Sequence, residues 1–213
     1  MGPGKFITFE GGEGAGKSTQ IKHLAAHLES QGIPVLTTRE PGGSEGAEAI
    51  RELLVTGEPD RWDASSEALL NFAARRNHVE TVIKPALEKG IWVLSDRFAD
   101  STTVYQGLAG GLGEDNIKKL YDLTLGNFAP DLTLILDLPA ELGLKRSNRR
   151  HQISASNEDR YERKDKAFHQ DLRAGFRKVA RDNPERCVLV DATGSEEKIE
   201  KAIRRILKDR LGV

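Results

Sequence analysis

The sequence has little of what would direct a protein to a membrane, to an oxidising compartment or to nucleic acid. Its 213 residues include a single cysteine, Cys187, which excludes an internal disulfide and agrees with a reducing compartment. No run of about 18 apolar residues and no signal-peptide core is present, so we expect neither a membrane span nor a membrane partner. The 32 basic and 33 acidic residues nearly cancel, without the positive excess typical of nucleic-acid binding. We therefore predict a cytoplasmic protein that has no nucleic-acid partner.

A regular alternation of apolar and amphipathic segments predicts the fold. Short, almost continuously apolar runs, typical of parallel strands covered on both faces, lie at 6–9, 35–38, 91–94, 132–138 and 187–190. Helical patterns lie at 19–30, 65–88 and 196–211, and Pro85 predicts a bend or break of the second near Lys84. This order predicts an α/β fold, a doubly wound five-stranded parallel sheet flanked by helices, formed as a single domain over residues 1–213.

The most specific local pattern is a glycine-rich segment between the first strand and the first helix. Residues Gly11 to Ser18 read G-G-E-G-A-G-K-S and match G-x-x-x-x-G-K-S. In such a phosphate-binding loop the backbone N–H groups surround an anion, Lys17 reaches the β- and γ-phosphates, and the hydroxyl of Ser18 holds Mg²⁺. The helix that follows adds its N-terminal dipole. Because a chance glycine-rich turn needs neither this strand nor this helix, we interpret the segment as a nucleoside triphosphate site.

Charged residues stand at the ends of four predicted strands. They are Glu10, Arg39, Asp96 with Arg97, and Asp137. Ligands of open α/β sheets bind beyond the carboxyl ends of the strands, so we expect these residues beside the bound triphosphate. Arginine forks match phosphate oxygens, and Asp96 or Glu10 is suited to hold Mg²⁺ through water. Each residue alone is compatible with a solvated strand end, but their common edge favours phosphoryl transfer.

Arginines also gather in the segment 145–166. They are Arg146, Arg149, Arg150, Arg160 and Arg163, and they flank the polar residues 151–157. Two helices joined by such a loop predict a helical lid that closes over the phosphates, excludes water and brings in positive charge. An ordinary solvated helix surface with i,i+4 ion pairs is the alternative interpretation.

Seven short motifs, in this order and spacing, make the chain similar to one enzyme family. They are Phe9-Glu10-Gly11, Thr38 to Gly43, Ala73-Ala74-Arg75, Asp96-Arg97-Phe98, Ser101 with Tyr105-Gln106-Gly107, Leu134 to Pro139, and Asp159 to Glu162. From Lys5 to the C-terminal helix the chain resembles bacterial thymidylate kinases, which are P-loop nucleoside monophosphate kinases with a helical lid. The resemblance implies phosphoryl transfer from ATP to dTMP, giving dTDP and ADP for dTTP synthesis, with Mg²⁺ as cofactor. It also implies a homodimer, and we expect its face on the third helix around Val79 and Val82.

The resemblance further implies roles for individual residues. ATP would be bound by Gly11, Gly12, Glu13, Gly14, Ala15, Gly16, Lys17, Ser18 and Thr19. The acceptor dTMP would be bound by Glu10, Arg39, Pro41, Phe72, Arg75, Arg97, Ser101 and Gln106. Catalysis would depend on Lys17, Arg97, Arg146, Arg149 and Arg150. The Mg²⁺ ion would be bound by Ser18 and Asp96, partly through water.

Two local features refine this resemblance. Some family members carry a helper arginine in the phosphate loop and others supply it from the lid; Glu13-Gly14-Ala15 contains none, so the chain resembles the lid-arginine type. Family members place an aromatic residue four positions before the equivalent of Arg75, where it can stack on thymine. This chain has Asn71 there and Phe72 one position later, about 100° further round the helix. An alignment that pairs Phe72 with Arg76 stays open.

Two other functions stay open as well. The chain could phosphorylate a different nucleoside monophosphate, because the residue at position 71 leaves the choice of base undecided. It could also be a P-loop NTPase that acts as a switch, although the Asn-Lys-x-Asp motif of a GTPase is absent.

Overall fold

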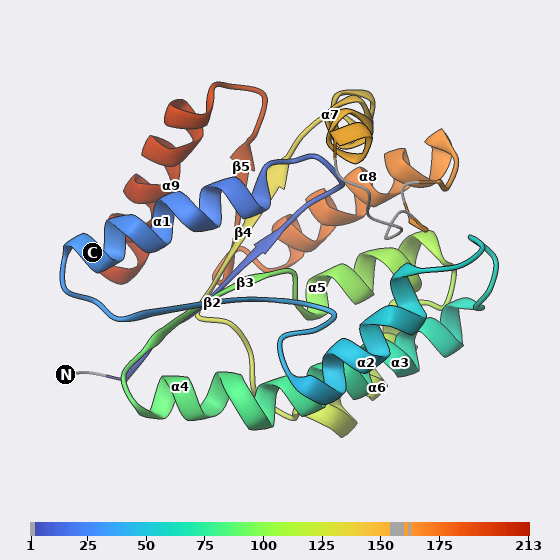
Figure 1. The fold of residues 1–213 in the computed structure, drawn as a ribbon, viewed down its shortest axis with the longest axis horizontal. Helices are drawn as coiled ribbons and strands as arrows, with labels where there is room; N and C mark the ends of the chain where they lie inside the picture. The colour runs from blue at the N-terminus through green and yellow to red at the C-terminus, as the bar shows by residue number, and fades with distance from the viewer. Residues whose placement is uncertain (1–2, 154–159, 162) are drawn as a thin grey trace.

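The described residues form one parallel sheet with helices on both of its faces (Figure 1). The computed structural model describes residues 3–153, 160–161 and 163–213, and of residues 148–153 it describes the backbone alone. The strands are β1 (Phe6–Glu10), β2 (Val35–Arg39), β3 (Trp92–Asp96), β4 (Leu132–Asp137) and β5 (Cys187–Asp191). All pairs are parallel, in the spatial order β2-β3-β1-β4-β5. The predicted five-stranded doubly wound sheet is therefore confirmed.

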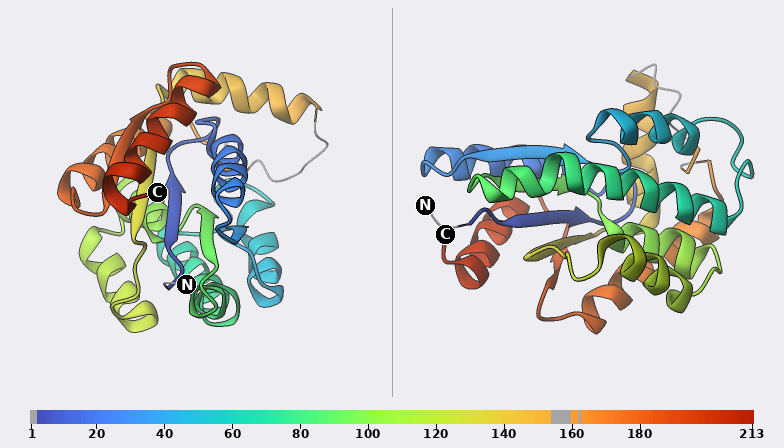
Figure 2. Two further views of the ribbon diagram at one scale, coloured as in Figure 1. Left: turned by 90° about the vertical axis from the view of Figure 1, so that its left-hand side faces the viewer. Right: turned by 90° about the horizontal axis from the view of Figure 1, so that it is seen from below.

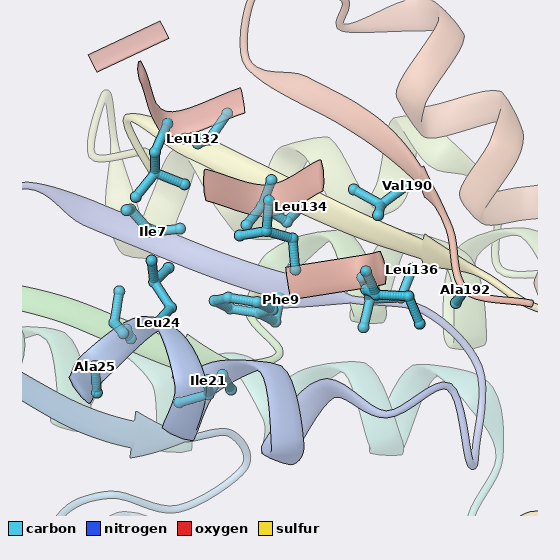
Figure 3. Packing of buried hydrophobic residues seen from close by; sticks show 14 of the residues in the cluster. Ile7, Phe9, Ile21, Leu24, Ala25, Leu132, Leu134, Leu136, Val190 and Ala192 are labelled. Carbon is cyan, nitrogen blue, oxygen red and sulfur yellow. The ribbon is translucent and has the colours of Figure 1, made fainter. Parts of the chain in front are cut away.

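Two helices cover one face of the sheet. They are α1 (Lys17–Ser30) and α9 (Glu196–Leu211), and both match the predicted helices. Figure 3 shows Ile21 and Leu24 of α1 beside Phe9 of β1 and Leu134 of β4, all of them buried. Ile203 of α9 belongs to the same cluster. Because β1 and β4 are covered on both faces, their sequences are nearly continuous apolar runs rather than alternating ones.

The remaining helices lie on the other face or at the carboxyl edge of the sheet (Figure 2). They are α2 (Glu45–Val55), α3 (Ala64–His78), η1 (Val79–Ile83), α4 (Lys84–Glu88), α5 (Ala99–Thr102), η2 (Thr103–Ala109), α6 (Glu114–Leu125), α7 (Ala140–Ile153) and α8 (Lys166–Asp182). Phe6 and Val93 of the sheet pack under α3, η1, α4 and α6, and Ile135 packs under η2 and α8. No helix in the described part of the chain is long and apolar enough to cross a membrane.

The predicted helix at 65–88 is one continuous helical rod made of α3, η1 and α4 (Figure 2). The turn η1 is π-helical, with Lys84 N donating to Val79 O, and it comes directly before Pro85 in the first turn of α4. A widened turn accommodates the proline ring, which lacks an N–H and would clash with the preceding turn of a regular α-helix. Val79 is fully buried in the core, so the expectation that it lies on a subunit face was wrong; Val82 is partly exposed.

Strand register brings the charged strand ends together. Arg39 at the end of β2 pairs with Asp96 at the end of β3, and Asp96 pairs with Phe9, the neighbour of Glu10 in β1. The phosphate-binding loop leaves β1 at this same edge and leads into α1. A ligand held by the loop is therefore close to residues that come from three strands.

Candidate active site

A cavity of about 470 Å³ opens at the carboxyl edge of β1, β2 and β3. One end is formed by the phosphate-binding loop, from Glu13 to Thr19. The rest of the wall includes Arg39, Glu40, Pro41, Arg51, Asn71, Arg75, Asp96, Arg97, Phe98, Ser101, Thr102, Tyr105, Gln106 and Tyr161. Most of the residues expected to bind ATP or the acceptor thus share one cavity, and this cavity is large enough for small ligands such as nucleotides.

The loop has the geometry of an anion site. Gly14 and Gly16 have φ values of 66° and 93°, a region that side chains rarely adopt. A Cβ atom on Gly14 would also lie 2.1 Å from the carbonyl oxygen of Gly143 in α7, so this residue must be glycine on both counts. Lys17 Nζ donates to the carbonyl oxygens of Gly11 at 3.2 Å and Gly12 at 3.1 Å, and burial lowers its pKa to about 8. The ammonium group is therefore held inside the loop, next to the N-terminus of α1.

Two oxygen-bearing side chains meet at the edge of the loop. Ser18 Oγ donates to Asp96 Oδ2 at 2.8 Å, and both residues line the cavity. A hydroxyl and a carboxylate are the hard oxygen donors that Mg²⁺ prefers, and Mg²⁺ sites commonly add only one or two carboxylates to substrate phosphates and water. The residues present therefore fit a Mg²⁺ ion shared with a bound triphosphate.

Arg97 is held beside the loop by four hydrogen bonds. Its Nη1 donates to Gly11 O and to Ser101 Oγ, both at 3.0 Å. Its Nη2 donates to Tyr105 OH at 2.9 Å and to Glu13 Oε1 at 3.2 Å. Burial alone would lower the pKa of Arg97, but the negative partners around it outweigh burial and raise the pKa above its ordinary value. The guanidinium group is a fixed positive charge on the cavity wall that contacts both the loop, at Gly11 and Glu13, and Ser101.

Glu13 connects this arginine to other elements, a role that the sequence analysis missed. Its Oε1 accepts hydrogen bonds from Arg97 and from Tyr105 OH, and its Oε2 lies 3.4 Å from Nδ1 of the buried His169 in α8. Burial raises the pKa of Glu13, but the His169 hydrogen bond and the charges of Arg97 and Lys17 together bring it down to about 2. The motif Tyr105-Gln106-Gly107 could have indicated from the sequence that Tyr105 belongs to the site. No sequence motif includes His169.

Arg75, whose side chain is 2% exposed, also lines the cavity. Its Nε donates to Glu40 Oε2 at 2.7 Å, and its Nη2 donates to Phe98 O and to Thr102 Oγ1, both at 3.1 Å. The guanidinium lies 5.0 Å from the ring centre of Phe72 and 5.3 Å from that of Phe98. Among the described residues Nη1 has no hydrogen-bond partner although it is buried. This nitrogen is a donor that awaits a ligand oxygen.

The other expected acceptor residues lie on the same wall. Pro41 lines the cavity, and Arg39 does so while it pairs with Glu48 at 3.1 Å on the protein surface. Gln106 donates from Nε2 to Glu67 Oε2 at 2.7 Å. Glu67, which was not among the expected residues, also accepts from Tyr161 OH at 3.2 Å. One buried carboxylate of α3 thus orients two cavity-lining side chains.

Several expected residues lie away from the wall of this cavity, among them Gly11 and Gly12, which line a second cavity. Glu10 is fully buried, its Oε1 accepts from Phe98 N at 2.7 Å and its Oε2 accepts from Ser101 Oγ at 2.5 Å. Phe72 is buried under the guanidinium of Arg75 and does not line the cavity. Its neighbour Asn71 lines the cavity instead. Asp137 forms a bidentate pair with Arg173 at 2.7 and 2.9 Å beside a smaller cavity behind the loop. Asp137 therefore lies next to the phosphate-binding loop but not on the wall of the main cavity.

The surroundings of Glu10 perturb its ionisation. Burial, followed by the negative charge of Asp100, raises its pKa to about 7. The carboxyl group thus supports Ser101 from behind the wall, and Ser101 in turn contacts Arg97.

The predicted lid is described in part. α7 carries Arg146, which is exposed, and the side chains of Arg149 and Arg150 lie outside the described residues, as does the segment 154–159. Arg160 is 1% exposed and not part of a solvated surface: it donates to the carbonyl oxygens of Leu54, Glu58 and Pro59 and to Glu67 Oε1. Arg160 therefore ties the chain between α7 and α8 to the α2–α3 loop.

The chain is similar to known enzymes over almost its whole length. The family model described as Thymidylate kinase matches residues 9–203. The thymidylate kinase of Caulobacter vibrioides is 53% identical over 213 residues, 100% of both chains. That of a Bradyrhizobium species is 51% identical over 210 residues, 99% of this chain and 92% of the relative. The crystal structure of thymidylate kinase from Ehrlichia chaffeensis matches with a TM-score of 0.76 and 34% identity, over 97% of this chain and 99% of that one.

Proposed function

The chain belongs to the thymidylate kinase family, and from this we propose that it transfers the γ-phosphoryl group of ATP to dTMP, giving dTDP and ADP for dTTP synthesis. The observation that carries the proposal is a single cavity lined both by the phosphate-binding loop and by Arg75. The loop is suited to the phosphates of a donor, and Arg75 has a buried nitrogen, Nη1, without a hydrogen-bond partner among the described residues. A donor triphosphate and an acceptor nucleotide can therefore occupy the cavity together, with Arg97 between them.

The loop end binds ATP. Residues Gly11 to Thr19 surround the phosphates with backbone N–H groups, and Lys17 contacts the β- and γ-phosphates. An anion there raises the pKa of the buried Lys17 ammonium group back towards its ordinary value, because the negative charge opposes the effect of burial. Ser18 and Asp96 hold Mg²⁺, which when bound offsets the negative charge of the phosphates.

The middle of the cavity supports the transfer itself. Phosphoryl transfer is catalysed mainly by alignment and by charge neutralisation, so the fixed guanidinium of Arg97 contributes more than a general base would. Arg39 and Arg97 bind the phosphate of dTMP near the transferred group. The loop contains no arginine, and the further positive charge comes from Arg146, Arg149 and Arg150 of the lid.

The far end binds the sugar and base of the acceptor. Arg75 Nη1 donates to an oxygen of the nucleotide, and Ser101 and Gln106 contact the base and sugar. Glu10 acts through Ser101, and Phe72 acts through Arg75, since neither lines the cavity. Asn71 gives this wall a polar amide, so base recognition depends more on hydrogen bonds than on stacking.

We also propose that the enzyme is a cytoplasmic homodimer made of a single kinase domain per chain. Leu69 on α3 is 57% exposed and Leu123 on α6 is 82% exposed, and these two helices pack against each other. Contiguous exposed apolar surface marks protein–protein contacts, and we propose that these two leucines belong to such a surface. The buried, unpaired Cys187 is compatible with the reducing conditions of the cytoplasm.

A coupled assay that follows ADP formation tests the function. Turnover of ATP with dTMP is compared with turnover with dUMP, dCMP, dGMP and thymidine, and with ATP alone. The proposal requires dTMP to give the highest kcat/KM. Preference for another monophosphate would identify a different kinase, and ATP hydrolysis faster without acceptor than transfer to dTMP would indicate an NTPase switch.

A further inference from the structure

Arg75 is held by three hydrogen bonds of unequal strength. Its Nη2 contacts Phe98 O and Thr102 Oγ1, but both of these are neutral acceptors. In the part of the chain that the structure describes, its one charged partner is the carboxylate of Glu40, whose Oε2 accepts from Nε at 2.7 Å. Because hydrogen bonds between charged groups are about twice as strong as neutral ones, the orientation of Glu40 largely decides where Nη1 points.

Glu40 is itself oriented by a second partner. Its side chain is 2% exposed at the end of β2, and its backbone N–H donates to Asp96 O. The other carboxylate oxygen, Oε1, lies 3.0 Å from Nδ1 of His78. A carboxylate held at one oxygen can rotate about its terminal bond, whereas one held at both oxygens cannot do so without losing a bond.

His78 is held in turn from its opposite nitrogen. Its side chain is 0% exposed at the end of α3, and Nε2 lies 2.8 Å from Thr38 Oγ1. An ionised carboxylate only accepts, so Nδ1 carries the hydrogen of the Glu40 bond, and Nε2 takes Thr38 as its partner. Gly43 closes over the ring: a Cβ atom there would lie 2.3 Å from Nε2. His78 does not line the cavity, so any effect on a ligand passes through Glu40.

We propose that His78 is a positioning residue for acceptor binding: through Glu40 it fixes Arg75 so that Nη1 faces the acceptor nucleotide. This inference rests on the proposed function, because it takes the far end of the cavity as the acceptor site. A series of side-chain hydrogen bonds, Thr38–His78–Glu40–Arg75, links β2 to α3. The proposal predicts that weakening this hydrogen-bond series impairs acceptor binding and leaves ATP binding unchanged.

The test compares two substitutions of His78 with opposite expectations. His78→Leu removes both nitrogens, whereas His78→Asn keeps an amide nitrogen near the position of Nδ1 and retains the bond to Glu40. His78→Leu should raise KM and the equilibrium Kd for dTMP about tenfold, which corresponds to about 1.4 kcal/mol. The KM for ATP should change by less than about twofold, and kcat at saturating dTMP by less than about threefold. His78→Asn should recover most of the loss.

A control separates positioning from a general loss of stability. Gln20→Ala removes a partly buried hydrogen bond between α1 and α9, from Gln20 Nε2 to Glu196 O at 3.1 Å, and neither residue lines the cavity. It should lower the melting temperature without raising the KM for dTMP. If His78→Leu does not fold, Thr38→Val removes the partner of Nε2 at almost constant shape, and Thr38→Ser should restore it.

Several results would overturn the inference. One is an unchanged KM for dTMP in His78→Leu or, if that variant does not fold, in Thr38→Val. Another is a parallel rise in the KM for ATP and dTMP, and a third is no rescue by His78→Asn. If the wild-type enzyme prefers a different nucleoside monophosphate, the proposed function fails, and the same variants are compared with that acceptor.

Discussion

Removing the charge of Glu13 should destabilise the folded protein at neutral pH and change how its stability depends on pH. The side chain is 9% exposed and shares its carboxylate among Arg97, Tyr105 and His169. Glu13→Gln keeps the shape and one acceptor oxygen but removes the negative charge. The variant therefore isolates the electrostatic part of the interaction.

The magnitude follows from the pKa. The folded-state pKa of Glu13 is about 2, against an ordinary value of 4.5. A difference of about 2.5 units corresponds to about 3 kcal/mol of unfolding free energy at pH 7. Because the folded pKa is depressed, this contribution is present above pH 4.5 and is lost as the pH falls towards 2. About 1 kcal/mol should be lost by pH 4 and about 2 kcal/mol by pH 3.

Urea denaturation of the wild type and of Glu13→Gln, at pH 7 and at lower pH, measures this difference. The gap in unfolding free energy should be about 3 kcal/mol at pH 7 and should narrow as the pH falls. Glu58→Gln, at a carboxylate that is 86% exposed, serves as the control and should show no such gap. A gap that is equal at pH 7 and pH 4, or one below about 1 kcal/mol at pH 7, would refute the reasoning.

Four further outcomes are expected. Glu10→Gln should change the pH dependence of stability in the opposite direction to Glu13→Gln. The folded-state pKa of Glu10 is raised to about 7, so the wild type loses unfolding free energy as the pH rises from 4.5 through 7, whereas the variant does not. Equal urea midpoints of the two proteins across this pH range would contradict the prediction. Arg97→Ala should lower kcat by about 10³-fold with its circular dichroism spectrum unchanged, and near-normal turnover would remove Arg97 from the transfer step. Arg160→Ala should cost about 3–5 kcal/mol in urea, because Glu67 is left buried without its cation, and a smaller loss than about 1 kcal/mol would show that water replaces it. Leu123→Asp should shift the protein towards monomers in sedimentation experiments, and an unchanged mass would place the subunit contact elsewhere.

The individual strands and the phosphate-binding loop were predictable because each is a short pattern of consecutive residues. A buried parallel strand is a short apolar run, and β1 and β4 are continuous in this sense. The loop requires glycines at fixed spacing between a strand and a helix, and the two glycines of that spacing, Gly11 and Gly16, both have positive φ values. The helical run 65–88 was predicted by its period, but the π-helical turn at Val79–Ile83 depends on how the backbone adapts to Pro85.

The candidate site was predictable only in part, because the side chains that support its wall from behind are far apart in the sequence. Glu13 meets His169 although more than 150 positions separate them in the sequence, and His78 meets Glu40 across 38 positions. Nothing near His169 or His78 in the sequence signals these contacts. Neighbouring residues also differ in ways that periodicity does not fix: Asn71 lines the cavity while Phe72 packs beneath Arg75.

The sequence by itself determined the class of fold, the phosphate-binding loop and the family to which the chain belongs, because each depends on residue types at short, fixed spacings. The tertiary structure decided which polar side chains face the ligand and which support them from behind. Glu10 ends β1 in the sequence as Asp96 ends β3, yet Glu10 is buried behind Ser101 and Asp96 meets Ser18 at the cavity. That difference arises from how the helices pack on the sheet, which determines the solvent exposure and hydrogen-bond partners of each strand end.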